Sequence, residues 1–309
     1  MKLKFVEQQY QTDAVNSICD LFEGCQIKDS LFTIDMSQDV SEQSRDIEGM
    51  GYAIGHANRL TISDADLLEN TQNIQAHHNI MMSKDLNGKN FTIEMETGTG
   101  KTYVYTKTIL ELNKRYGMTK FIIVVPSIAI KEGVYKSFQN TEEHFRDKYD
   151  NVIYSYFVYD SNNLNRIQTF ATSINVEIMI INIDAFRKSF DDPNKDTKAN
   201  IIHRESDKLS GNKPIDLISS TNPIVIIDEP QSVDGTKKSE EAIASLNPMV
   251  TLRYSATHKK TYNLMYRLTP IDAYNEHLVK SIEVASIVSK DASAKPYVKL
   301  LSVSDKNGF

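Results

Sequence analysis

Residues 95–102, METGTGKT, combine two glycines with a lysine and a threonine at the spacing of a phosphate-binding loop. Glycine has no Cβ, so the backbone can approach a phosphate closely, and N–H groups at the start of a helix can donate to it. Lys101 can reach the terminal phosphates of a nucleotide, and the Thr102 hydroxyl can ligate magnesium. The predicted phosphate-binding residues are Thr97, Gly98, Thr99, Gly100, Lys101 and Thr102.

The motif departs from the general pattern G-x-x-x-x-G-K-[ST] at its first position, where Met95 replaces glycine. The alternative is an ordinary turn between a strand and a helix. The flanking residues favour the phosphate loop, because 91–95 is a short apolar strand pattern and apolar residues recur at helical spacing from Tyr105 until Gly117. The loop is therefore predicted to open a helix.

An acidic pair, Asp228 and Glu229, follows the apolar run at 223–227. Beside a triphosphate, Asp228 can hold magnesium through its water shell and Glu229 can orient or deprotonate the attacking water. The predicted catalytic residues are thus Glu229, Lys101 and Asp228, and the predicted magnesium ligands are Thr102 and Asp228. The alternative is that Asp228 only caps a following helix. Its position downstream of a phosphate loop favours the catalytic role.

A further polar group follows the apolar run at 250–254 and consists of Ser255, Ala256, Thr257 and His258. Small hydroxyl side chains at a strand end can hydrogen-bond both the acidic turn and a partner lobe, which would transmit phosphate status elsewhere. Together with Gln231, these residues are predicted to couple the nucleotide to motion. In isolation, His258 would more often be a surface histidine or one with satisfied hydrogen bonds.

Tyr10 and Gln11 lie at the start of a helix predicted at 7–23. A glutamine amide offers one donor and one acceptor and can read the edge of adenine, and the Tyr10 ring could help to shape a base pocket. The alternative is a helix start without a ligand. Without the motifs that follow, this alternative would be favoured.

Short apolar runs at 91–95, 121–125, 176–181, 223–227 and 250–254 alternate with helical segments. This alternation predicts buried parallel strands, right-handed crossovers and a three-layer α/β domain with a mostly parallel sheet. Ligands bind such sheets at the carboxyl ends of the strands, where the candidate residues follow. We interpret 25–90 as an insertion with one helix near 64–77, and the charged stretch 188–214 as a mobile surface loop.

The composition bounds the class of protein. A chain of 309 residues with 40% hydrophobic and 25% charged residues can build one large or two modest domains. It contains no apolar stretch of membrane-spanning length and its first residues lack a secretory pattern, so a cytoplasmic protein without membrane contact is expected. The net charge of −6 argues against binding nucleic acid through bulk positive charge but permits a local track.

Taken in order, YQ, METGTGKT, FIIVVPSIAI, DEPQ and SATH resemble the first motor lobe of superfamily two helicases and translocases. The DEPQ box, the run SATHK and the segment YRLTPIDAYNEHLVKSIEV narrow this to a resemblance to the Res subunit of type III restriction enzymes. The resemblance implies a RecA-like P-loop NTPase fold, with a first motor lobe at 1–280 that carries the insertion at about 25–90. It also implies that 281–309 begins a linker to a second lobe.

The same resemblance implies the cofactors ATP and Mg²⁺, and the partners double-stranded DNA and a Mod methyltransferase subunit that recognises the DNA site. Carried over by position, Gln11 would read adenine, and Pro126 and Ser127 would lie near the DNA backbone. The family's complete subunit adds a second RecA-like lobe and a nuclease domain. Since this chain ends at Phe309, we expect a fragment with little hydrolysis of its own.

Two other functions remain open at this point. One is the motor lobe of a different superfamily two translocase, such as a type I restriction subunit or a repair helicase. The other is a module that binds ATP or DNA without turnover.

Overall fold

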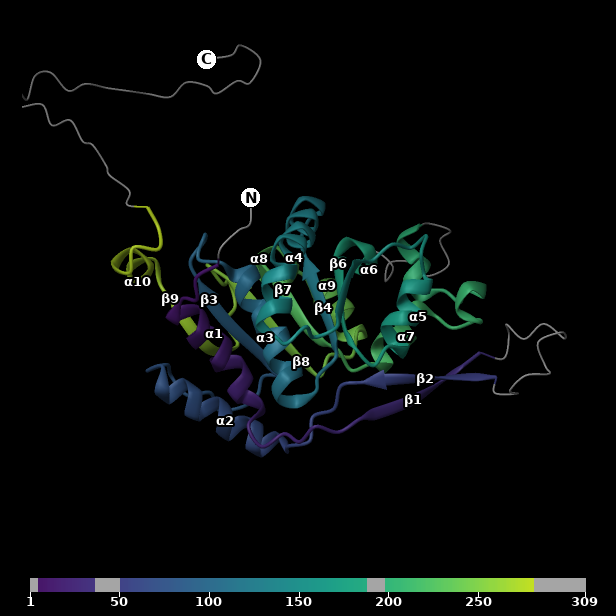
Figure 1. Cartoon of the computed structure of the whole chain (residues 1–309), viewed down its shortest axis with the longest axis horizontal. Coiled ribbons are helices and arrows are strands. Elements are labelled where there is room, and N and C mark those ends of the chain that lie inside the picture. Colours follow the sequence, from purple (N-terminus) through teal and green to yellow (C-terminus); the bar gives the residue numbers. More distant parts are fainter. Residues whose placement is uncertain (1–4, 37–50, 188–197, 281–309) are drawn as a thin grey trace, which may run out of the picture.

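The computed structural model describes residues 5–36, 51–187 and 198–280. Its centre is a seven-stranded parallel sheet with the order β5-β6-β4-β7-β8-β3-β9, flanked by helices (Figure 1). The predicted α/β fold with a mostly parallel sheet is confirmed. The strands of this sheet are β3 (Asn90–Met95), β4 (Lys120–Val125), β5 (Tyr154–Val158), β6 (Val176–Asn182), β7 (Ile224–Asp228), β8 (Val250–Ser255) and β9 (Asn263–Leu268).

Two hydrophobic cores lie on opposite faces of the sheet, because alternate residues of a strand point in opposite directions. In β4, Ile123 belongs to one core while Ile122 and Val124 belong to the other. The first core is covered by α1 (Gln9–Cys19), α2 (Asp64–His77), α3 (Lys101–Tyr116) and α4 (Ile128–Lys148). The second is covered by α5 (Asn165–Thr172), α6 (Asp184–Arg187), α7 (Pro214–Ser220) and α9 (Lys237–Ser245).

Helix α3 follows the glycine-rich loop directly. Gly100 is its N-cap and Gly117 its C-cap, and both have a left-handed backbone that glycine adopts readily. A Cβ on Gly117 would also lie 2.8 Å from Ile27, so both the backbone conformation and the available space favour glycine here. The predicted helix start at the loop and stop at Gly117 are confirmed.

The described residues of the region predicted as an insertion, 25–36 and 51–90, form two separate pieces. Strands β1 (Ser30–Asp35) and β2 (Tyr52–Ala57) pair as an antiparallel hairpin that extends along one end of the sheet and packs against α5, while α2 packs near α1 and β9 (Figure 1). Asn58 joins the base of the hairpin to the sheet. Its Oδ1 accepts from the N–H groups of Thr119 and Lys120, and its Nδ2 donates to the Lys120 carbonyl at 2.7 Å.

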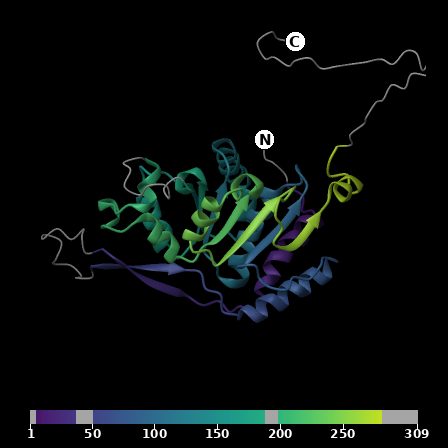
Figure 2. The same cartoon turned by 180° about the vertical axis from the view of Figure 1, so that it is seen from behind.

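Several sequence expectations differ from the structure. Strands β5 and β9, which form the two edges of the sheet, were not predicted; Figure 2 shows the sheet from behind, with β8 and β9 toward the viewer. The helix predicted at 7–23 is α1 followed by a 3-10 helix, Asp20–Phe22. Of the charged stretch predicted as a surface loop, 188–197 lies outside the described residues. The remainder is not simply a surface loop, because Ile202 and Leu209 are fully buried in the second core.

Four further elements lie within the described residues: α8 (Pro230–Val233), α10 (Pro270–Asn275) and two 3-10 helices, Lys198–His203 and Asp207–Leu209. No helix within the described residues is long and apolar enough to cross a membrane. The linker predicted at 281–309 lies outside the described residues.

Candidate functional site

The predicted site residues come together at the carboxyl ends of three adjacent strands. The order β7-β8-β3 places the acidic pair, the Ser255 turn and the glycine-rich loop side by side. Asp228 pairs in register with Tyr254, and Ser255 with Glu94. A parallel sheet brings its carboxyl ends to one edge, so three segments distant in sequence meet there.

The start of α1 hydrogen-bonds to the glycine-rich loop. The Thr99 carbonyl accepts a hydrogen bond from the Tyr10 hydroxyl at 2.9 Å and one from Gln11 Nε2 at 3.1 Å. A Cβ on Gly100 would lie 2.8 Å from Gln11 Nε2, so a side chain here would displace the Gln11 amide from its contact with the loop. The two residues predicted to face a base therefore contact the loop itself. Tyr10 is largely buried, and the Gln11 amide nitrogen is engaged with the loop carbonyl.

Two cationic or donor groups of the loop are held by carboxylates of the chain. The Thr97 N–H donates to Glu96 Oε1 at 2.7 Å. Lys101 Nζ lies 3.4 Å from Glu229 Oε1, with its side chain only 11% exposed. Gly98, by contrast, has a left-handed backbone and nothing within 4 Å of the position that a Cβ would take. The loop therefore has open space at Gly98, beside Lys101, whose positive charge is partly neutralised by Glu229.

Asp228 is the last residue of β7 and is 6% exposed. Burial, followed by the neighbouring Glu229 charge, raises the pKa of its carboxyl to about 6 despite the opposing effect of Lys101. Its Oδ2 lies 3.5 Å from the hydroxyl of Tyr105, a fully buried residue of α3. Asp228 is therefore a partly desolvated carboxylate at the edge where the loop begins, a position suited to a cation.

Glu229 adopts a left-handed backbone, with φ 55° and ψ 60°, at the N-cap of α8. This conformation is uncommon for a residue with a Cβ. It accompanies a side chain with several partners: Oε2 accepts from Gln231 Nε2 at 2.6 Å and lies 2.9 Å from Ser255 Oγ, while Oε1 faces Lys101. Burial opposes ionisation, but these hydrogen bonds and the Lys101 charge hold the pKa of Glu229 below its ordinary value.

Ser255 links the acidic turn to the strand that follows. Its hydroxyl lies within 2.9 Å of Glu229 Oε2 and Gln231 Oε1 and 2.8 Å from the Thr257 carbonyl, while its oxygen accepts from the Thr257 N–H at 3.2 Å. One hydroxyl proton can serve only one of these acceptors at a time. The serine can therefore donate either to Glu229 or to the Thr257 carbonyl in its own turn. Ala256, between Ser255 and Thr257, has no polar side chain.

His258 packs under the same edge. Its Nε2 lies 3.3 Å from the Ile93 carbonyl in β3, and burial lowers its pKa below the ordinary histidine value. Its Nδ1 is buried without a hydrogen-bond partner among the described residues. Pro126 and Ser127 follow β4, the neighbour of β7, where Ser127 Oγ accepts from the Ile130 N–H and caps α4. The side-chain hydrogen bond of Ser127 is thus made to the start of its own helix and not to the loop or the acidic pair.

Sequence reasoning missed Glu96 and Tyr105. Glu96 had no role beyond its place in the motif, and Tyr105 was used only as an apolar position of the helix. A signal for Tyr105 was present, because it stands one turn after Thr102 and carries a hydroxyl on the helix face that had to be buried.

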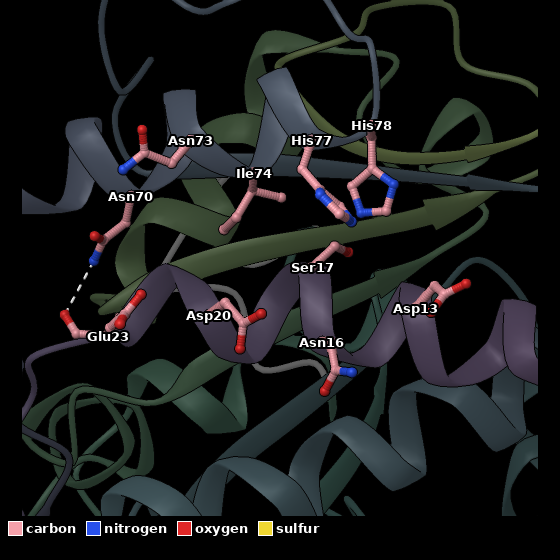
Figure 3. A pocket seen from close by; sticks show the side chains of 10 residues that line it. All are labelled: Asp13, Asn16, Ser17, Asp20, Glu23, Asn70, Asn73, Ile74, His77 and His78. Atoms are coloured by element: carbon pink, nitrogen blue, oxygen red, sulfur yellow. Dashed lines mark hydrogen bonds between the residues drawn. The ribbon is translucent and has the colours of Figure 1, made fainter.

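A separate cavity of about 320 Å³ lies between α1 and α2, where Asp13, Asp20, His77 and His78 are among the lining residues (Figure 3). None of its lining residues belongs to the predicted site. In the part of the chain that the structure describes, no group of three or more histidine, cysteine, aspartate or glutamate side chains is arranged to hold a metal ion. The carboxyl edge of the sheet is therefore the candidate site.

Comparison with known proteins identifies the family of this chain. Residues 4–260 match the family model described as "Type III restriction enzyme, res subunit". The chain is 36% identical over 243 residues to the Res subunit of the Escherichia coli enzyme EcoP15I, covering 72% of this chain and 24% of that protein. It is 33% identical over 232 residues to the EcoPI Res subunit of Escherichia phage P1, covering 70% and 23%.

Two solved structures are more distant, each at 11% identity. The Sulfolobus solfataricus SWI2/SNF2 ATPase core in complex with double-stranded DNA matches with a TM-score of 0.34, over 62% of this chain and 31% of that one. A nuclease-deletion mutant of the type ISP restriction-modification enzyme LlaGI, in complex with a DNA substrate mimic, matches with a TM-score of 0.41, over 71% and 21%. The chain spans about a quarter of the length of its curated relatives. On the family match, this chain belongs to the Res subunits of type III restriction enzymes.

Proposed function

We propose that this chain is an ATP-binding motor lobe. In a complete Res subunit it couples ATP hydrolysis to movement on double-stranded DNA and, with a Mod methyltransferase subunit, to DNA cleavage. The observation that carries the proposal is the meeting of Lys101 and Glu229, 3.4 Å apart, beside an open glycine-rich loop. The family match favours this reading over a type I restriction motor or a repair helicase.

The residues present fit a nucleoside triphosphate. Gly98 leaves open space where a side chain would stand, and Gly100 keeps the backbone close to Gln11. The Thr97 N–H already binds an anionic oxygen, that of Glu96, which a phosphate oxygen could replace. Lys101 supplies the positive charge that terminal phosphates require.

The residues also fit magnesium, a cation that prefers oxygen ligands. Asp228 offers a carboxylate and Thr102 a hydroxyl, on neighbouring elements at the same edge. When bound, magnesium would neutralise charge on the transferred phosphoryl group. In this proposal the chain's own contribution is to hold these two oxygen atoms in place.

Glu229 is proposed to act on the attacking water. Its Oε2 is held by Gln231 and Ser255, and its Oε1 faces the lysine, so the carboxylate is ionised and oriented toward the loop. An ionised, oriented carboxylate can position a water and accept its proton. Ser255 can then report a change at Glu229 to the turn at Thr257 through its single hydroxyl proton.

ATP binding by this chain is the first test. Lys101→Ala is expected to weaken Mg·ATP binding by about 1.5 to 3 kcal/mol, the range for hydrogen bonds to charged groups, which is about 10- to 150-fold in affinity. Lys114→Ala is the matched control, because Lys114 is an exposed lysine of the same helix, far along it from the loop. Isothermal titration calorimetry measures both. Equal affinities for wild type and a folded Lys101→Ala variant would exclude this loop as the phosphate site.

The rival function is binding without turnover. Phosphoryl transfer in related enzymes gains on the order of 10³ to 10⁵ in rate from positive charge supplied by another domain. We therefore expect little hydrolysis from residues 1–309 alone and DNA-stimulated hydrolysis from the complete subunit. A complete subunit that binds ATP but shows no hydrolysis with or without duplex DNA would favour the rival.

A further inference from the structure

Tyr105 is a polar side chain in an apolar core. It lies in the second turn of α3, is fully buried, and packs edge-on against Tyr254 of β8, with ring centroids 5.6 Å apart. A buried hydroxyl without a partner would cost free energy, so the groups around it indicate why it is kept.

The partners of this hydroxyl are the two proposed magnesium ligands. Tyr105 Oη lies 3.5 Å from Asp228 Oδ2, and it also interacts with the Thr102 side chain, which lies one helical turn earlier on α3. One phenol oxygen thus connects the helix that carries the loop to the strand that carries the carboxylate.

We propose that Tyr105 is a positioning residue for the cation site, whose hydroxyl fixes the side-chain orientations of Thr102 and Asp228. The inference rests on the proposed function. By donating to one oxygen of Asp228, the phenol leaves the other oxygen for a cation. By accepting from the Thr102 hydroxyl, it takes up that proton and leaves the lone pairs of the Thr102 oxygen available to a cation. A cation then meets two oriented ligands instead of two mobile ones.

Removing this hydroxyl should weaken the contribution of magnesium and leave the rest of the nucleotide site intact. Tyr105→Phe keeps the ring and its packing and removes one oxygen. Because the contact with Asp228 is long, the expected loss is below the range for a hydrogen bond to a charged group and within that of an ordinary hydrogen bond, about 3- to 10-fold.

Tyr254→Phe is the matched control. Tyr254 is the other fully buried tyrosine of this pair, but its hydroxyl lies 3.4 Å from Thr108 Oγ1, away from the proposed ligands. Both variants therefore lose one buried hydroxyl from the same core. Only Tyr105→Phe loses a contact to the site.

The experiment measures ATP affinity by calorimetry in excess MgCl₂ and again in EDTA, for wild type and both variants. The ratio of the two affinities reports how much the cation adds. For Tyr105→Phe, this ratio is expected to fall about 3- to 10-fold with the EDTA affinity unchanged; for Tyr254→Phe, both should match wild type. A merely structural role would lower both affinities together and leave the ratio unchanged, which would overturn the inference.

Failure of the proposed function looks different. In that case wild type itself would bind no ATP, or would bind it equally in MgCl₂ and EDTA, and both proposals would be overturned. A wild type with a clear magnesium effect and a Tyr105→Phe variant with the same ratio would overturn only the role of Tyr105.

Discussion

Asp228→Asn is expected to stabilise the nucleotide-free chain at neutral and alkaline pH. In the folded chain, burial and the nearby Glu229 charge raise the pKa of Asp228 from its ordinary value of 3.8 to about 6. Because the folded pKa is the higher one, the contribution of this group to stability is fully present below pH 3.8 and is lost as the pH rises through 6. The asparagine amide is neutral at every pH, so the variant does not lose stability through ionisation of this side chain as the pH rises.

The magnitude follows from the two pKa values. They differ by about 2, which corresponds to about 3 kcal/mol at pH 8 and to less than about 1 kcal/mol at pH 4. Asp228 is 6% exposed, so solvent screening reduces this figure little. The same substitution removes the carboxylate proposed to hold magnesium, and stability and cation binding should therefore change in opposite directions.

Urea unfolding of wild type and Asp228→Asn at pH 8 and pH 4 measures the effect without nucleotide. The variant should be more stable at pH 8, and the difference in free energy of unfolding should nearly vanish at pH 4. A variant no more stable than wild type at pH 8 would refute the reasoning. So would a difference of the same size at both pH values, since that would not depend on ionisation of the aspartate.

Three further outcomes are expected. Glu229→Gln in the complete subunit should keep ATP binding and lose at least about 100-fold in hydrolysis rate, measured under steady state, because an amide is a poor base; wild-type turnover would remove its assigned role. Gly100→Ala should destabilise the chain more than Gly98→Ala in thermal unfolding, since both glycines have positive φ but only a Cβ on Gly100 would meet Gln11. Adding Gln11→Ala should remove this difference between the two variants. A difference that persists in the Gln11→Ala background would contradict crowding by Gln11 as its cause. Asn58→Ala should cost about 2 to 4 kcal/mol in urea unfolding, because two backbone N–H groups and a carbonyl at the start of β4 lose their partner; a loss below about 0.5 kcal/mol would contradict it.

The meeting of the candidate residues at one end of the sheet could be predicted from the sequence, because each segment is recognised from its own short stretch of residues. A loop, a strand end and a helix start can each be recognised locally, and the rule that parallel strands present their carboxyl ends together does the rest. Strand order is different. Nothing local indicates that β8 lies between β7 and β3, yet this order is what brings Ser255 within 2.9 Å of Glu229.

The two missed strands show the limit of an apolar pattern. β9 carries Asn263 and Arg267, and β5 carries Ser155, so neither reads as the continuous β-branched run that predicts a buried strand. Both lie at edges of the sheet, where one side of a strand has no neighbour and polar residues are tolerated. The apolar pattern also failed to predict that Ile202 and Leu209 are buried, because two isolated apolar residues in a charged segment do not repeat at the spacing of a helix or a strand.

The backbone of Glu229 had no signal in sequence either, because glutamate does not favour a left-handed conformation. Such a conformation costs on the order of 1 kcal/mol and persists only where its surroundings determine it. Here those surroundings are Lys101, Gln231 and Ser255, which together hold both carboxylate oxygens. The left-handed backbone of Glu229 is therefore explained by the contacts of its carboxylate, and not by the helix α8 that follows it. The four-residue length of α8 agrees with this, since so short a helix can impose little on its N-cap.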